Sequence, residues 1–165
     1  MAQGMAEKDG LDKRLDERDR REAKDNLTRE QRARGAQYAP KAFNALCADV
    51  KRIVADYKKR ARDSTITVSE NHGFLAIHRG PFPAFHMEVH PPRVEPLSNL
   101  IRVEGWLITH KSAEREYLSV VVEVLPDDDT PGQYVLYHGD GLETVDATVP
   151  EQILSRIFDA LMVAR

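Results

Sequence analysis

Three side chains that can bind a metal alternate along residues 84–90, AFHMEVH. His86, Glu88 and His90 occupy every second position, so on an extended strand all three point to one face. Imidazole and carboxylate groups suit zinc and related transition metals. Neighbouring members of this set lie about 7 Å apart along a strand, so a shared ion needs chain curvature or a further ligand. His78 could be that ligand if its own strand pairs beside His86.

Residues 100–125 are predicted to add charged and aromatic side chains to the same face. The candidate binding residues there, together with Glu88, are Arg102, Glu104, Trp106, Tyr117 and Glu123. Aromatic side chains flanked by polar residues are typical of protein-binding hot spots. Ladders of ion pairs between strands explain the same charges without any ligand. An ion-pair ladder, a partner-binding surface and a metal or catalytic site all remain open interpretations.

Short alternating segments predict the strands that carry these residues. We expect strands at residues 65–69, 74–79, 84–90 and 133–138, and two long strands joined by a charged turn at 111–114 within residues 100–125. A register with Val103 opposite both Met87 and Val122 gives one wholly apolar face. The same register places Glu88, Arg102 and Glu123 in one row across three strands.

Two amphipathic helices are predicted to cover the apolar face of this sheet. The first spans residues 40–62, with Pro40 in its first turn, where a proline is tolerated. Its apolar side is formed by Phe43, Leu46, Cys47, Val50, Ile53, Val54 and Tyr57. The second is a closing helix with Thr148 as N-cap and Glu151 completing a capping box. Its apolar side is formed by Ile153, Leu154, Ile157, Phe158 and Leu161.

A charged arm precedes the first helix. Residues 7–34 hold nine acidic and ten basic side chains, and their only large apolar residues are Leu11, Leu15 and Leu27. Helix-forming residues dominate, but no apolar stripe is available for burial. We expect a helical or disordered arm, either a transient solvated helix or a frayed solubilising tail. The alternatives are a segment that orders on a partner and a nucleic-acid contact. Gly35 and Pro40 are expected to mark a break in secondary structure between the arm and the first helix.

The predicted fold class is therefore α+β, with an antiparallel sheet of about six strands and N-terminal and C-terminal amphipathic helices packed on one face. The chain divides into the charged arm, residues 1–36, and a single domain, residues 37–165. Its 165 residues are enough for a core without metals or disulfides. The single cysteine, Cys47, is expected to be buried and unreactive because it lies on the apolar stripe of the first helix.

Composition limits the classes of partner. A net charge of −3 argues against a protein that coats nucleic acid. The basic cluster of Lys58, Lys59, Arg60 and Arg62 suits a helix C-terminus, and nucleic-acid contact at this cluster is the alternative interpretation. The sequence contains neither an apolar leader nor a run long enough to span a membrane, so we expect no membrane contact and a cytoplasmic location.

No catalytic or nucleotide-binding fingerprint occurs in the chain, and no cofactor is predicted. We expect a non-enzymatic protein-binding or assembly module that uses the polar and aromatic sheet face, or a sheet edge, to engage a protein or another copy of itself. The alternative is a small-ligand or metal-binding domain, possibly hydrolytic, that uses His78, His86, Glu88 and His90.

Overall fold

A computed structural model of the chain describes residues 2–109, 114–138, 150–151 and 153–155, with side chains from residue 13 onward. One long helix is followed by six strands. Their bounds are α1 Ala2–Ala61, β1 Ile66–Asn71, β2 Phe74–Arg79, β3 Ala84–His90, β4 Leu100–Ile108, β5 Glu116–Pro126 and β6 Tyr134–His138. The predicted α+β class with a six-stranded antiparallel sheet is confirmed.

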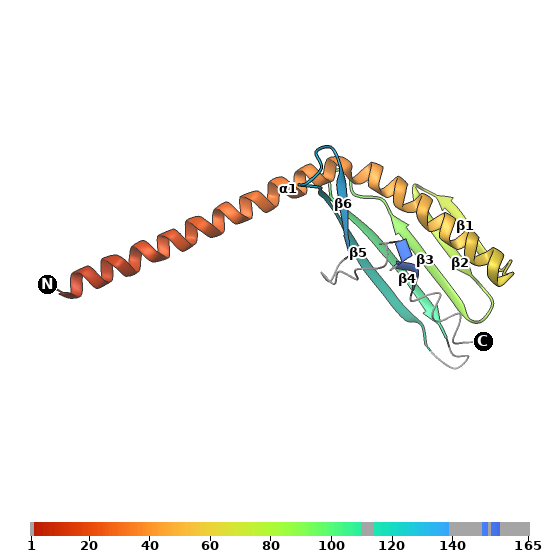
Figure 1. The fold of residues 1–165 in the computed structure, drawn as a ribbon. Coiled ribbons are helices and arrows are strands. Elements are labelled where there is room, and N and C mark those ends of the chain that lie inside the picture. The colour runs from red at the N-terminus through yellow and green to blue at the C-terminus, as the bar shows by residue number, and fades with distance from the viewer. Residues whose placement is uncertain (1, 110–113, 139–149, 152, 156–165) are drawn as a thin grey trace.

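The strands form a meander in which each pairs with the next along the chain, in the order β1 to β6. The second half of α1 runs across one face of this sheet, and the first half extends beyond the sheet (Figure 1). β1 and β6 are the two edge strands.

The second half of α1 packs through a stripe of small and aliphatic side chains. The buried members are Ala36, Ala39, Ala42, Leu46, Cys47, Val50 and Val54, a spacing of three or four residues. They share one hydrophobic cluster with sheet residues such as Phe85, Met87 and Ile101. The apolar face predicted for the first helix is therefore confirmed, and it begins about two turns earlier, at Ala36 and not at Phe43.

The expected break at Gly35 and Pro40 is wrong, because α1 is continuous through both residues. A proline inside a helix removes one backbone hydrogen bond and typically costs about 3 kcal/mol. Here Ala36, Ala39 and Ala42 are buried on both sides of Pro40, whose own ring is exposed. Burial of the neighbouring turns against the sheet offsets the local cost, so tertiary packing overrides the propensity.

Gly35 lies where α1 first meets the sheet. A Cβ atom at this position would lie 2.1 Å from the carbonyl oxygen of Val124 in β5. Only glycine allows the helix backbone to come this close to the strand. The exposed part of the helix ends here, since Gly35 and Ala36 are buried whereas Arg32, Ala33 and Arg34 are exposed.

The strand registers differ from the predicted ones by two residues. Val103 pairs with Val89 and Val120, not with Met87 and Val122. A shift of two residues keeps every side chain on its face, because the side-chain period of a strand is two. The apolar face is therefore as predicted, with Ile101, Val103 and Val122 buried.

Part of the closing segment joins the same core. Pro150, Glu151 and Ile153–Ser155 are helical, and Ile153 and Leu154 are buried in the cluster that contains the α1 stripe. Thr148 and the remainder of the predicted closing helix lie outside the described residues, as does most of the charged turn at 111–114. The sheet face that α1 covers is thus the core face, and candidate site residues lie on the other one.

In the part of the chain that the structure describes, no helix combines the length and apolar character needed to cross a membrane.

Candidate functional site

Eight side chains on the sheet face opposite α1 form a polar and aromatic surface that we call the histidine face. Its members are His78, His86, Glu88, His90, Arg102, Glu104, Trp106 and Tyr117. They come from β2, β3, β4 and β5. In β3 the pattern is strict, because Phe85, Met87 and Val89 are buried while the alternate positions are half-buried.

Four aromatic side chains lie in one row across the middle of this face. Register pairs His78 with His86, His86 with Trp106, and Trp106 with Tyr117. The register of β2 and β3 thus places His78 beside His86, which is the condition under which the sequence added it to the set. Tyr117 ends the row and is 75% exposed. Directly paired positions on one face bring side chains to about 5 Å, so the row is a continuous strip.

Glu88 connects the two histidines that flank it on β3. Its two carboxylate oxygens each accept a hydrogen bond at 3.0 Å, one from Nε2 of His86 and the other from Nε2 of His90. Hydrogen bonds to one carboxylate thus connect both imidazoles across the spacing of about 7 Å between neighbouring members of this set.

The hydrogen bonds of Glu88 determine its charge. The bond from His86, partly opposed by burial and reinforced by the bond from His90, holds the pKa of Glu88 below its usual value. Glu88 is therefore ionised at neutral pH and can only accept hydrogen bonds. Both histidines must donate to it through Nε2.

This arrangement orients the other nitrogen of His86. In a neutral imidazole that carries its proton on Nε2, Nδ1 has a free lone pair. Nδ1 of His86 lies 3.3 Å from Nδ1 of His78 on the next strand. The two rings are 5.4 Å apart at their centroids and meet at 64°. Glu88 therefore directs an imidazole lone pair toward a second imidazole.

Aromatic and cationic contacts surround this histidine pair. The Trp106 ring lies 6.3 Å from the rings of both His78 and His86, edge-on to the first and nearly parallel to the second. The Arg115 guanidinium covers Trp106 at 4.3 Å from the ring centroid, a cation–π contact. At the other end of β3, His90 stacks on Phe74 at 5.1 Å. Arg115 and Phe74 were not among the predicted site residues.

Arg102 and Glu104 are exposed on β4, four and two positions before Trp106 on the same face. Within the described residues, neither side chain takes part in an ion pair or hydrogen bond. The predicted row of Glu88, Arg102 and Glu123 is wrong, because Glu88 pairs with Glu104 and Arg102 pairs with His90. The two-residue shift of register is the reason.

Glu123 belongs to a different part of the molecule. Its carboxylate accepts a hydrogen bond from Asn99 at 3.2 Å and pairs with Arg32 of α1 at 3.3 Å. It therefore helps to attach α1 to β5 near Gly35, and the structure does not bring it into the aromatic row.

No three His, Cys, Asp or Glu side chains among the described residues form a cluster that could hold a metal ion. In the set named by the alternative prediction, Glu88 is engaged by His86 and His90, which separates these two rings. Only His78 and His86 bring two ring nitrogens close together. Sequence spacing alone could not distinguish a ligand from a hydrogen-bonded carboxylate at Glu88.

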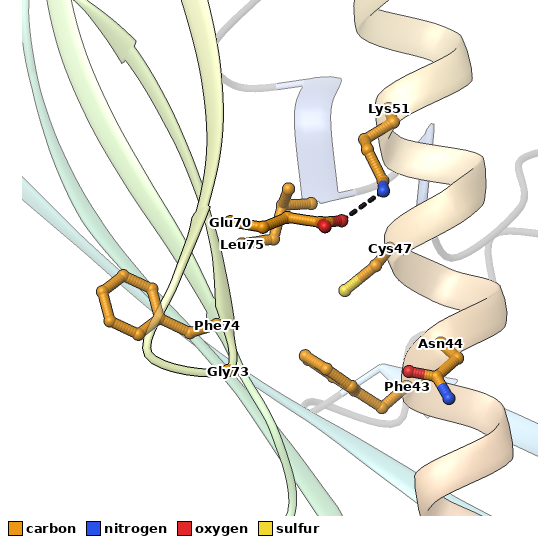
Figure 2. A pocket seen from close by; sticks show the side chains of 8 residues that line it. All are labelled: Phe43, Asn44, Cys47, Lys51, Glu70, Gly73, Phe74 and Leu75. Carbon is orange, nitrogen blue, oxygen red and sulfur yellow. Dashed lines mark hydrogen bonds and ion pairs between the residues drawn. The ribbon is translucent and has the colours of Figure 1, made fainter.

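A hollow of about 330 Å³ lies on the core side, between α1 and the turn that joins β1 and β2. Figure 2 shows Phe43 and the Cys47 sulfur directed into it, the ion pair of Lys51 and Glu70 above, and the Phe74 ring pointing away. Burial raises the pKa of the Cys47 thiol to about 11. The thiol is thus protonated at neutral pH, and the prediction that Cys47 is buried is confirmed.

The basic cluster at the end of α1 is separate from the histidine face. Lys58, Lys59 and Arg62 line an open hollow of about 560 Å³ with Asp63.

The chain matches no protein-family model, and neither curated proteins nor solved structures give a significant match to it.

Proposed function

We propose that this protein is a non-enzymatic assembly module that uses the histidine face to bind a protein partner, and that this partner is a second copy of the chain. The observation that carries the proposal is the aromatic row of His78, His86, Trp106 and Tyr117 across four adjacent strands. Tyrosine and tryptophan are enriched at the centres of protein interfaces.

The charges beside the row support a self-complementary contact. Arg102 and Glu104 have opposite signs, are exposed, and lie two positions apart on β4. In a two-fold dimer the same surface is used by both copies. A second β4 crossing in the antiparallel direction would place its Glu104 against Arg102 and its Arg102 against Glu104. This pairing gives both charges the partner that they lack among the described residues.

The position of α1 is also consistent with this use of the sheet. α1 packs on the opposite face, and the predicted closing helix would add to that same layer. The histidine face would then be the side available for a partner. The exposed first half of α1 would extend the contact or modulate it.

Sedimentation across a wide range of concentrations tests the proposal on the full chain. We expect a reversible monomer–dimer equilibrium. Tyr117→Ala should weaken the dimer by about thirtyfold or more, because loss of an interface hot spot costs at least about 2 kcal/mol. A control substitution in the exposed part of α1, Arg18→Glu, should leave the equilibrium unchanged.

A charge exchange gives the sharper test. Arg102→Glu alone and Glu104→Arg alone each place like charges across the two-fold axis, and each should weaken the dimer by about tenfold. The double variant restores opposite charges and should recover much of the lost affinity. A chain that remains monomeric at every concentration rejects self-assembly. A dimer whose affinity is unchanged by Tyr117→Ala and by each single charge variant uses another surface.

A second candidate function, metal binding, has its own supporting observation: the contact between the His78 and His86 imidazoles.

A further inference from the structure

We infer that His78 and His86 form a two-imidazole site for a divalent transition-metal ion, with Glu88 as the residue that orients His86. The inference rests on the 3.3 Å separation of the two Nδ1 atoms and on the hydrogen bond between Nε2 of His86 and Glu88. It does not depend on the proposed dimer, because all three residues belong to one chain.

The separation of the two nitrogens fits two ligands of one ion. Zinc–imidazole bonds measure about 2.0–2.1 Å, and tetrahedral coordination then places two ligand nitrogens about 3.3–3.4 Å apart. The observed distance between Nδ1 of His78 and Nδ1 of His86 is 3.3 Å. An ion can therefore bind between the two Nδ1 atoms with little movement of either strand.

Glu88 supplies the outer contact that metal-binding histidines characteristically have. A ligating imidazole usually donates its second N–H to a carboxylate, which determines the tautomer and makes the ring a better ligand. Glu88 accepts from Nε2 of His86 at 3.0 Å and leaves Nδ1 free to coordinate. The same carboxylate is itself held by His90 at 3.0 Å. Glu88 is thus a positioning residue.

The paired strands place the two imidazoles side by side. His78 and His86 occupy directly paired positions of β2 and β3, and the Trp106 ring lies within 6.3 Å of both imidazoles. Two protein ligands leave positions for water, so we expect reversible binding that is weaker than that of a closed four-ligand site. Imidazole ligands favour Zn²⁺, Ni²⁺ and Cu²⁺ over Mg²⁺ and Ca²⁺.

Titration of the full chain with Zn²⁺ or Ni²⁺ alone tests this inference. Calorimetry should give one ion per chain, and Mg²⁺ should not bind. Trp106 is the only tryptophan of the chain, so its fluorescence reports on the site directly. Long-range proton–nitrogen spectra should show Nδ1, not Nε2, of His78 and His86 shifting with metal.

Matched variants assign the ligands. His78→Gln and His86→Gln should each abolish the signal at Trp106. Glu88→Gln should weaken binding by about 10–100-fold while leaving the number of ions unchanged. His72→Asn removes an exposed imidazole at the β1–β2 turn, where the backbone φ of 54° also suits asparagine. This control should bind with the affinity of the unmodified chain.

The inference is overturned if the unmodified chain shows no response, or if His78→Gln binds as tightly as the His72→Asn control. Far-ultraviolet circular dichroism of each variant without metal verifies its fold, and a variant that unfolds is replaced by His78→Phe, which keeps a ring in the row. The same titration of Arg102→Glu, whose dimer is expected to be about tenfold weaker, at a concentration where this variant is monomeric, separates this result from the fate of the dimer.

Discussion

The two halves of α1 are stabilised by different interactions although they form one continuous helix. Residues 13–34 are exposed almost throughout and span about 33 Å at 1.5 Å per residue. Residues 35–61 bury a stripe against the sheet. The first half is supported by helix-forming residues and by weak pairs such as Arg18 with Glu22 at 3.8 Å. The second half is held by packing.

Tertiary contact with the sheet therefore determines which substitutions in this helix change the stability of the fold. The half with ion pairs contributes little to stability per side chain, since exposed pairs contribute about 0–1 kcal/mol. The half that contains Pro40, the poorest helix former, is the one that the sheet stabilises. Three pairs of substitutions test this difference between the two halves, in decreasing order of the expected change in stability.

The largest contrast is between two leucines of α1. Leu46 is 1% exposed in the core, and Leu27 is 56% exposed in the projecting half. Leu46→Ala should lower the free energy of unfolding by about 2–5 kcal/mol through lost burial and an added cavity. Leu27→Ala should change it by less than about 0.5 kcal/mol. Urea denaturation measures both, and equal effects would show that the projecting half is packed in solution.

The next contrast is between two ion pairs. Asp63, just after α1, pairs with Arg79 at 3.1 Å, and the two side chains are only 8% and 15% exposed. Burial alone would raise the pKa of Asp63, but hydrogen bonds from Thr65 and Arg79 outweigh it and hold that pKa below its usual value. Arg79 also donates to the carbonyl oxygens of Pro81 and Pro83. Asp63→Asn should destabilise the fold by about 1.5–3 kcal/mol at neutral pH.

The pH dependence of that loss has a defined sign. A carboxylate with a lowered pKa stabilises the fold above its unfolded pKa of about 3.9, and the contribution is lost as pH falls through the folded value. The difference between Asp63→Asn and the unmodified chain should therefore be constant near neutral pH and shrink below about pH 4. Glu22→Gln, in the exposed pair, should show only a small difference at any pH. An undiminished Asp63→Asn difference in acid would contradict the ionic role.

Much of the sheet could be predicted from sequence because alternation identifies which face each residue occupies. Met87 and Val103 were assigned to the core, and His86 and Trp106 to the opposite face, as the structure has them. Alternation cannot distinguish a register from one shifted by two residues, since both satisfy the same pattern. The predicted row of Glu88, Arg102 and Glu123 is therefore wrong, while the placement of His86 and Trp106 on the same face agrees with the observed register.

Other features of the candidate site depend on contacts that lie far apart in sequence. Glu123 resembles any exposed strand carboxylate until Arg32 of α1, 91 residues away, is placed beside it. The cation–π contact of Arg115 with Trp106 requires the register of β4 and β5. The charged arm contains no apolar stripe, so its composition alone left helix and disorder open.

The smallest contrast concerns Gly35, where the two halves of α1 meet and where two effects have opposite signs. Helix propensity alone predicts that Gly35→Ala stabilises the chain by about 1 kcal/mol. The new Cβ would, however, lie 2.1 Å from the Val124 carbonyl oxygen. The backbone fixes the positions of both atoms, so no side-chain rotation relieves the clash. Overpacking of this kind typically costs about 1–3 kcal/mol, so subtracting the propensity gain of about 1 kcal/mol leaves an expected net loss of up to about 2 kcal/mol.

The reverse substitution at an exposed position provides the control for Gly35. Ala45 lies in the same helix with its side chain exposed, and Ala45→Gly should cost about 1 kcal/mol through propensity alone. Thermal or urea unfolding of the two variants then separates the effects. If both contacts and propensity are as described, alanine is the worse residue at 35 and the better one at 45. A gain in stability from Gly35→Ala would mean that α1 does not approach β5 this closely, and the packed half of the helix would then begin at a later turn.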